Sequence, residues 1–115
     1  MAPITPALLL KALDGLTLRS IATAQNIANA NSPGYRPLAV NFEDALKRAA
    51  ATGDVRAIEA VEPRIGQVVD QDGDSKLRLD LELATDAQTA SRFAALAELL
   101  NRRLQLEALS VSGTR

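Results

Sequence analysis

Apolar side chains recur at steps of three and four residues in the first third of the chain. Such spacing brings them to one face of an α-helix, and no proline interrupts the stretch from residue 7 to residue 31. We therefore predict a helix over residues 5–31. Its apolar seam, the face that would pack against another helix, is predicted to comprise Leu9, Leu13, Leu16 and Ile27.

A second stretch with this spacing lies near the other end of the sequence and predicts a helix over residues 80–109. Its seam is predicted to comprise Phe93, Leu96, Leu100 and Leu104. Two long amphipathic helices in one chain can lie antiparallel and bury their seams against each other. The sequence therefore predicts a mainly all-α fold in which the terminal helices pair as an antiparallel coiled coil.

A turn and a short third helix are predicted for residues 32–53. Pro33 and Gly34 suit the two central positions of a type II turn, which needs a positive φ at the second of them. Asn41 is suited to cap the short helix, and Gly53 to end it. The first long helix is therefore expected to stop at a fixed point.

Residues 54–79, the variable middle segment, allow two interpretations. Leucines alternate with charged residues from Leu77 to Leu83, which favours a strand, and Asp72 with Gly73 would supply the turn of a β-hairpin over residues 67–83. An irregular loop that leads into the C-terminal helix fits the same residues equally well. In both cases residues 1–115 form a single domain.

The composition narrows the chemistry that the chain can perform. It contains neither His nor Cys, so the commonest general base, thiolate nucleophiles and thiolate metal sites are absent. Residues 70–74 resemble the start of a calcium-binding loop, but Ser75 stands where that loop needs Gly, and Leu81 where it needs Glu. We therefore predict that the protein is not an enzyme and that it holds no metal and no cofactor.

The net charge, the apolar runs and the aromatic content indicate which partners the chain can have and how stable it is alone. The net charge is −1 with acidic and basic residues interspersed, so we expect no nucleic-acid partner. Apolar runs such as residues 7–10 are far shorter than the ~20 residues that a membrane-spanning helix needs. Aromatic residues make up only 3%, so the core must be built from Leu, Ile, Val and many Ala. We expect an isolated chain to be marginally stable and to gain stability by packing against copies or partners.

Three asparagines, Asn26, Asn29 and Asn31, fall within six residues at the end of the first predicted helix, and Ser32, Pro33, Gly34 and Tyr35 follow directly. One asparagine near a helix C-terminus is ordinary capping. An asparagine in a helix seam fixes the register of the packing at a cost in stability. No catalytic chemistry needs this arrangement, so we interpret residues 26–35 as an assembly motif.

The segment from Ala28 to Tyr35 resembles the N-terminal motif of the bacterial flagellar rod and hook family, Ala-Asn-x-x-Thr-Pro-Gly-Tyr, with Ser32 in place of the usual threonine. Residues 42–46 and 99–103 are similar to members of the family that build the proximal rod. The resemblance covers roughly residues 8–50 and 79–106. The middle segment departs from it, because it is shorter than usual and lacks the family's common histidine.

This resemblance implies a structural subunit of the basal-body rod, which assembles helically and transmits torque from the MS ring to the hook. The implied partners are further copies of the chain, other rod subunits of the FlgC and FlgF types, the FliE adaptor and the MS-ring protein. The implied location is the basal body in the periplasmic space, reached by flagellar type III export without a cleaved signal peptide. The alternatives are another axial rod subunit, or a soluble helical adaptor or chaperone that binds a partner helix in its seam.

Overall fold

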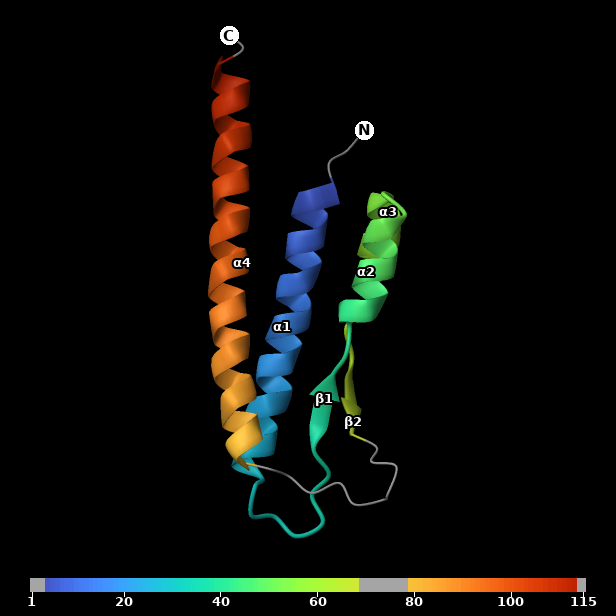
Figure 1. The fold of residues 1–115 in the computed structure, drawn as a ribbon, viewed down its shortest axis with the longest axis vertical. Coiled ribbons are helices and arrows are strands. Elements are labelled where there is room, and N and C mark those ends of the chain that lie inside the picture. Colours follow the sequence, from blue (N-terminus) through green and yellow to red (C-terminus); the bar gives the residue numbers. More distant parts are fainter. Residues whose placement is uncertain (1–3, 69–78, 114–115) are drawn as a thin grey trace.

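The molecule is built around two long helices. The computed structural model describes residues 4–68 and 79–113, and within them helix α1 spans Ile4–Ala28 and helix α4 spans Leu79–Gly113. The two helices lie side by side and run in opposite directions (Figure 1). The predicted mainly helical fold, with long terminal helices in contact, is confirmed.

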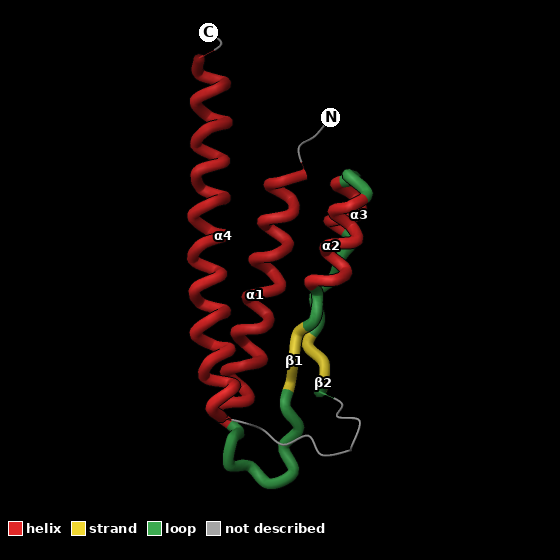
Figure 2. Tube along the Cα trace, in the orientation of Figure 1, coloured by secondary structure: helices red, strands yellow, loops and turns green. Residues whose placement is uncertain are grey.

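The elements between the two long helices form an arm on the other side of α1. This arm, residues 38–67, consists of strand β1 (Leu38–Val40), helix α2 (Glu43–Ala51), helix α3 (Val55–Glu59) and strand β2 (Ile65–Gln67). The strands are antiparallel, with Leu38 opposite Gln67 and Val40 opposite Ile65. As Figure 2 shows, α1 lies between α4 and the arm, so it is the helix on which both other parts pack.

The end of α1 comes earlier than the sequence predicted. The helix stops at Ala28 and not at residue 31, because its last turn tightens: the Ala30 N–H donates to Ile27 O and the Ser32 N–H to Asn29 O, both three residues back. The Asn29 side chain also donates to the carbonyl of Gln25, at 2.9 Å. Side chains that bond to the backbone in this way compete with the helix ladder.

The short helix α2 begins differently from the prediction. Its N-cap residue is Phe42, without a side-chain cap, so the expected capping by Asn41 is wrong. Two acidic residues in its first turn, Glu43 and Asp44, compensate by placing negative charge at the positive end of the helix dipole. At the other end, Gly53 has a φ of +70°, as expected of a glycine that follows a helix C-cap.

The strand predicted from the alternating leucines is wrong where the structure describes it. Residues 79–83 form the first turn of α4, and the observed hairpin pairs residues 38–40 with residues 65–67. Leu79, Leu81 and Leu83 are all exposed, so their alternation does not mark a buried face of a sheet. The proposed turn at Asp72 and Gly73 lies outside the described residues.

Helix α4 also continues past its predicted end at residue 109 and reaches Gly113. The reason is local, because the stretch from Leu79 onward contains no proline and its first glycine is Gly113. The additional residues belong to the part of α4 that extends beyond the start of α1 (Figure 1).

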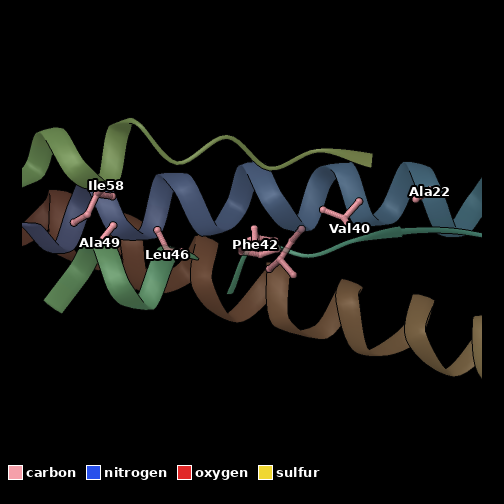
Figure 3. Packing of buried hydrophobic residues seen from close by; sticks show 7 residues of the cluster. Ala22, Val40, Phe42, Leu46, Ala49 and Ile58 are labelled. Atoms are coloured by element: carbon pink, nitrogen blue, oxygen red, sulfur yellow. The ribbon is translucent and has the colours of Figure 1, made fainter. Parts of the chain in front are cut away.

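The hydrophobic core lies between α1 and the arm. Its buried members come from α1, β1, α2, α3 and the short link before α2; they are Leu16, Ala22, Val40, Phe42, Leu46, Ala49 and Ile58. Figure 3 shows these side chains along the face of α1 that meets β1 and α2. Among residues 79–111 of α4, whose side chains are described, Thr89 is the one buried residue. Helix α4 therefore lies along α1 with few fully buried side chains of its own.

Candidate functional site

Asn26 joins three parts of the molecule. Its side chain is 1% exposed and makes four hydrogen bonds. The amide nitrogen donates to Leu38 O at 2.8 Å and to Glu82 Oε2 at 3.0 Å. The amide oxygen accepts from the Tyr35 hydroxyl and from the Leu38 N–H, both at 2.8 Å. Since an asparagine amide offers two donors and two acceptor positions, its whole capacity is used.

Side chains of α1 form the hydrogen bonds with β1 that a third strand would otherwise form. One edge of β1 pairs with β2, and the backbone groups of Leu38 and Val40 point the other way, toward α1. Asn26 satisfies both groups of Leu38, and the Arg19 guanidinium donates to Val40 O at 2.6 Å. Arg19 and Asn26 are seven residues apart, which is two helical turns, so they project from the same face of α1. An unpaired strand edge is thereby covered by side chains.

Tyr35 brings the end of the turn back to this network. Its hydroxyl donates to Asn26, and the ring is half-buried beside the start of α4. Burial raises the pKa of Tyr35 above its usual value of 10.0, and the negative charge of Glu82 raises it further. The phenol is therefore held in its neutral, donating form.

The turn itself has the geometry that Pro33 and Gly34 predict. The Tyr35 N–H donates to Ser32 O at 3.2 Å across these two residues, and Gly34 has a φ of +73°. A positive φ at this position is what a type II turn requires and what residues other than glycine rarely adopt. The turn reverses the chain so that Tyr35 can reach Asn26.

The three asparagines do different things. Asn26 is buried and connects α1 to β1 and α4, whereas Asn29 acts locally. The Asn29 side chain donates to Gln25 O and accepts a 3.3 Å bond from the Ser32 hydroxyl, which ties the last helical turn to the following loop. Asn31 and Ser32 are exposed, as are Pro33 and Gly34. The buried network therefore draws on Asn26 and Tyr35 from the predicted motif, and the rest of the motif shapes the turn.

A second polar link between α1 and the arm was missed by the sequence reasoning. Arg19 forms a bidentate ion pair with Glu43 at the start of α2, with both N–O distances at 2.7 Å. The same guanidinium lies 5.0 Å from the centre of the Phe42 ring, within the range of a cation–π contact. The Arg19 hydrogen bonds lower the pKa of Glu43 below its usual value. The two partners are 24 residues apart, so no local spacing rule could have paired them.

Gly15 allows this ring to approach α1. A Cβ atom placed on Gly15 would lie 2.4 Å from the Phe42 ring, closer than any real contact of that kind. Phe42 is thus seated against the bare backbone of the helix. The signal that could have revealed this was Gly15 itself, the one glycine within residues 4–28, because a glycine inside a helix costs about 1 kcal/mol relative to alanine and needs a packing reason.

The predicted seam residues divide into two groups. Leu9 and Leu16 are buried, and Leu13, Ile27, Leu96 and Leu100 are half-buried. Phe93 and Leu104 remain 40% and 50% exposed, so they do not lie in a closed seam. The contact between α1 and α4 is consequently open on both sides.

Two apolar grooves flank the contact between α1 and α4. The α1–α2–α4 groove has a volume of about 430 Å³, and its lining includes Leu8, Ala12, Leu46 and Leu96. A second groove, of about 380 Å³, lies along the other side and includes Ile21 and Phe93 in its lining. The exposed face of Phe93 thus belongs to a continuous apolar surface rather than to an isolated side chain.

Within residues 4–68 and 79–113, no cluster of three acidic side chains is arranged to hold a metal ion. None of the helices in this part of the chain is both long and apolar enough to cross a membrane. The Asn26 network and the two grooves are therefore the main features of the described surface and interior.

No protein-family model matches the chain, and a comparison with curated protein sequences finds no match either.

Proposed function

We propose that the chain is a structural subunit of the bacterial flagellar rod, similar to the proximal rod protein FlgB, which assembles helically with its neighbours and transmits torque from the MS ring to the hook. One observation supports this most directly. The segment that resembles the family's motif lies at the end of a long N-terminal helix, beside the start of an antiparallel C-terminal helix, and Asn26 bonds to Glu82 across the two.

The shape of the molecule supports a building element rather than a catalyst. It measures 64 × 25 × 14 Å and has a radius of gyration of 17.6 Å, against about 13 Å for a compact domain of this length. A thin, extended body offers much lateral surface to neighbours. Many of its leucines remain exposed along α4, as expected of side chains that become buried on assembly.

The proposed neighbours are further copies of the chain, FlgC-type and FlgF-type rod subunits, the FliE adaptor and the MS-ring protein, in the periplasmic part of the basal body. Within the family, a FlgC-type subunit is the alternative; Phe42 with Glu43, and the stretch from Asn101 to Arg103, favour the FlgB type. Co-sedimentation of the purified chain with FliE and with FlgC-type subunits would measure which neighbours it contacts.

The rival from another class is a helical adaptor or chaperone, and the α1–α2–α4 groove is the feature that favours it. An apolar groove between helices can hold the apolar face of a partner helix. Light scattering and electron microscopy of the pure protein at rising concentration distinguish the two. We expect growing helical polymers; particles that stay at one small size with a bound partner would support the adaptor and contradict the rod subunit.

A double substitution tests whether the turn matters for assembly. Pro33→Ala with Gly34→Ala removes the two residues that form the turn after α1, including the one with a positive φ, so Tyr35 should be displaced from Asn26. We expect polymers to be lost or irregular in this variant. The matched control is Pro63→Ala with Gly66→Ala, a proline and a glycine outside this turn, where an added Cβ at Gly66 meets nothing within 4 Å. Normal polymers from the first variant would contradict the role assigned to the turn.

A further inference from the structure

The C-terminal part of α4 extends beyond the helix that supports it. Asn26 of α1 lies opposite Glu82 of α4, and the helices are antiparallel. Ile4, the first residue of α1, is 22 residues before Asn26, and the residue 22 positions after Glu82 is Leu104. Residues 104–110, which we call the α4 extension, therefore lie beyond the first residue of α1 and are not packed against that helix.

This extension is apolar and exposed. Leu104, Leu106 and Leu109 are 50%, 64% and 68% exposed. Glu107 is the one charged residue between residues 104 and 110, so the segment combines three large apolar side chains with a single negative charge. Exposed apolar side chains gathered in one segment mark an interaction surface more often than those scattered singly.

The α1–α2–α4 groove has the opposite character. Its floor is apolar, and an apolar cavity of about 150 Å³ holds one benzene-sized group, so the volume of about 430 Å³ has room for two or three aliphatic side chains. Two cations, Lys47 and Arg92, line it, and neither has an ion-pair partner within the described ranges 4–68 and 79–113. The acidic residue in its lining, Glu43, is already bonded to Arg19.

We propose that the α4 extension of one copy docks into the α1–α2–α4 groove of a second copy. Leu106 and Leu109, which are three residues apart and so share a face of the helix, enter the apolar floor, and Glu107 lies near Lys47 and Arg92. The inference rests on the proposed function and names the contact by which copies join. A second copy is the occupant because the same chain presents both an apolar segment with one negative charge and an apolar groove with two free cations.

The extension cannot fill its own groove. Helix α4 is continuous from Leu79 to Gly113, and it contributes Arg92 and Leu96 to the groove well before the extension begins. An unbroken helix carries its end away from that place. The present partner of Glu107 is Arg103, at 3.5 Å one turn earlier on an exposed face. Such a pair contributes only about 0.3–0.5 kcal/mol, so it does not prevent Glu107 from turning to new cations.

The contact joins two different surfaces, which has a consequence for the product. Each pair of copies still has one free extension and one free groove, so further copies can add at both ends. The assembly stays open unless the rotation between successive copies closes a ring. The docking therefore produces open chains, as the proposed rod requires.

Disulfide trapping tests the docking directly, because the chain contains no native Cys and every bridge must come from the introduced pair. We expect Ala50→Cys with Leu109→Cys, one position in the groove and one in the extension, to give a ladder of cross-linked oligomers under mild oxidation. The control pair, Ala60→Cys with Leu109→Cys, uses an exposed alanine outside the groove and should remain monomeric.

Charge reversal provides the second measurement. Glu107→Lys in the cysteine pair should slow cross-linking about 1.4- to fivefold, the range for one exposed ion pair, and adding Lys47→Glu should restore the rate. Equal cross-linking of the groove pair and the control pair, or no recovery in the reversed pair, overturns the docking.

The failure of this inference can be told apart from failure of the proposed function. Helical polymers without selective cross-linking keep the rod subunit and overturn the docking. Selective cross-linking that stops at a closed dimer keeps the contact between extension and groove and overturns the open chain.

Discussion

One buried amide does much to organise this molecule. Asn26 is nearly inaccessible to solvent and has every hydrogen-bonding position occupied, by groups from a turn, a strand and a second helix. Apolar side chains can slide along one another at little cost, whereas a satisfied amide fits one arrangement only. The asparagine thus sets how α1 is aligned with both of its neighbours.

Replacing Asn26 with alanine should destabilise the fold by about 2–4 kcal/mol, because the backbone groups of Leu38 would be left buried without partners. Asn31→Ala is the matched control: it makes the same change in the same segment at an exposed position, and should stay within about 0.5 kcal/mol of the parent. Urea unfolding of both variants followed by circular dichroism measures the difference. Similar free energies of unfolding for the two would contradict the role of Asn26.

Tyr35 offers a probe of the same network. It is the single tyrosine of a chain without tryptophan, so the ultraviolet absorption of the phenolate reports this side chain alone. Because burial and Glu82 raise its pKa in the folded state, we expect the native protein to titrate above 10.0 and the urea-unfolded protein near that value. Identical titration curves in the two states would show that the hydroxyl is not in the network.

The shift also fixes the sign of a pH effect on stability. A group whose pKa is raised by folding stabilises the fold below its unfolded pKa, and that contribution is lost as the pH rises through the folded value. Stability should therefore fall above about pH 10, and Tyr35→Phe should lessen this fall. Since lysines also titrate in this range, the comparison is between the parent protein and the phenylalanine variant.

At the level of the elements, the start of α2 is held by the contact of an aromatic ring with a helix backbone. Phe42, just before α2, packs on α1 at Gly15, and Arg19 covers the ring from one turn further along. The contact and the ion pair to Glu43 together fix the start of α2 on α1. In an isolated helix, alanine at position 15 would be more stable than glycine. Here glycine is needed because the Phe42 ring occupies the place of a Cβ atom.

Gly15→Ala tests this packing. Alanine improves helix propensity by about 1 kcal/mol, but forcing a side chain into a filled site costs about 1–3 kcal/mol, so we expect net destabilisation of about 1–2 kcal/mol. Gly66→Ala is the control, because an added Cβ there meets nothing within 4 Å. Thermal melts compare the two. A more stable Gly15→Ala variant would mean that Phe42 yields easily and does not fix α2.

The long helices were predictable because their periodicity extends over many turns. The pattern places Leu9 and Leu16 on the buried face and correctly identifies the turn at Pro33 and Gly34. The end of α1 was misplaced by three residues because side-chain bonds from Asn29 act against further helix, and propensity does not include them. The end of α4 was misplaced because the seam pattern fades before the helix does, and no proline or glycine stands between Leu79 and Gly113 to stop it earlier.

The strands and the polar links escaped prediction for a different reason. A strand of three residues is too short to show a period, and β1 depends on Asn26 and Arg19, which come from another element. The bond between Asn26 and Glu82 spans 56 residues, and the Arg19–Glu43 pair spans 24. Such pairings follow from the folded arrangement and have no local signature in the sequence.

Considered as a whole, the molecule buries little for its length. Its buried core is confined to the region between α1 and the arm, and much of α4 remains exposed. A small domain buries less surface per residue than a large one. The free energy gained from this burial only slightly exceeds the cost of the conformational entropy lost on folding. Contacts between copies are therefore expected to supply part of the stability.

This expectation leads to a measurable dependence on concentration. If folding is linked to association, each tenfold rise in protein concentration should add about 1.4 kcal/mol per associating contact. We expect the melting temperature followed by circular dichroism to rise with concentration. A substitution that removes apolar surface from the α4 extension, Leu106→Ser with Leu109→Ser, should flatten the dependence. A cooperative, fully helical monomer whose melting temperature stays constant would contradict the expectation.

The hydrogen bonds from Asn26 and Arg19 to the edge of β1 also affect how the chain can misfold. Before α1 has docked, the backbone groups of Leu38 and Val40 on that edge are open to any other extended chain, and such edges nucleate amyloid-like aggregation. Two residues of one helix therefore keep this edge of β1 from pairing with another chain. We expect variants that lose these side chains to form insoluble, strand-rich deposits. Binding of amyloid dyes would detect these deposits more readily than circular dichroism would detect a loss of helix.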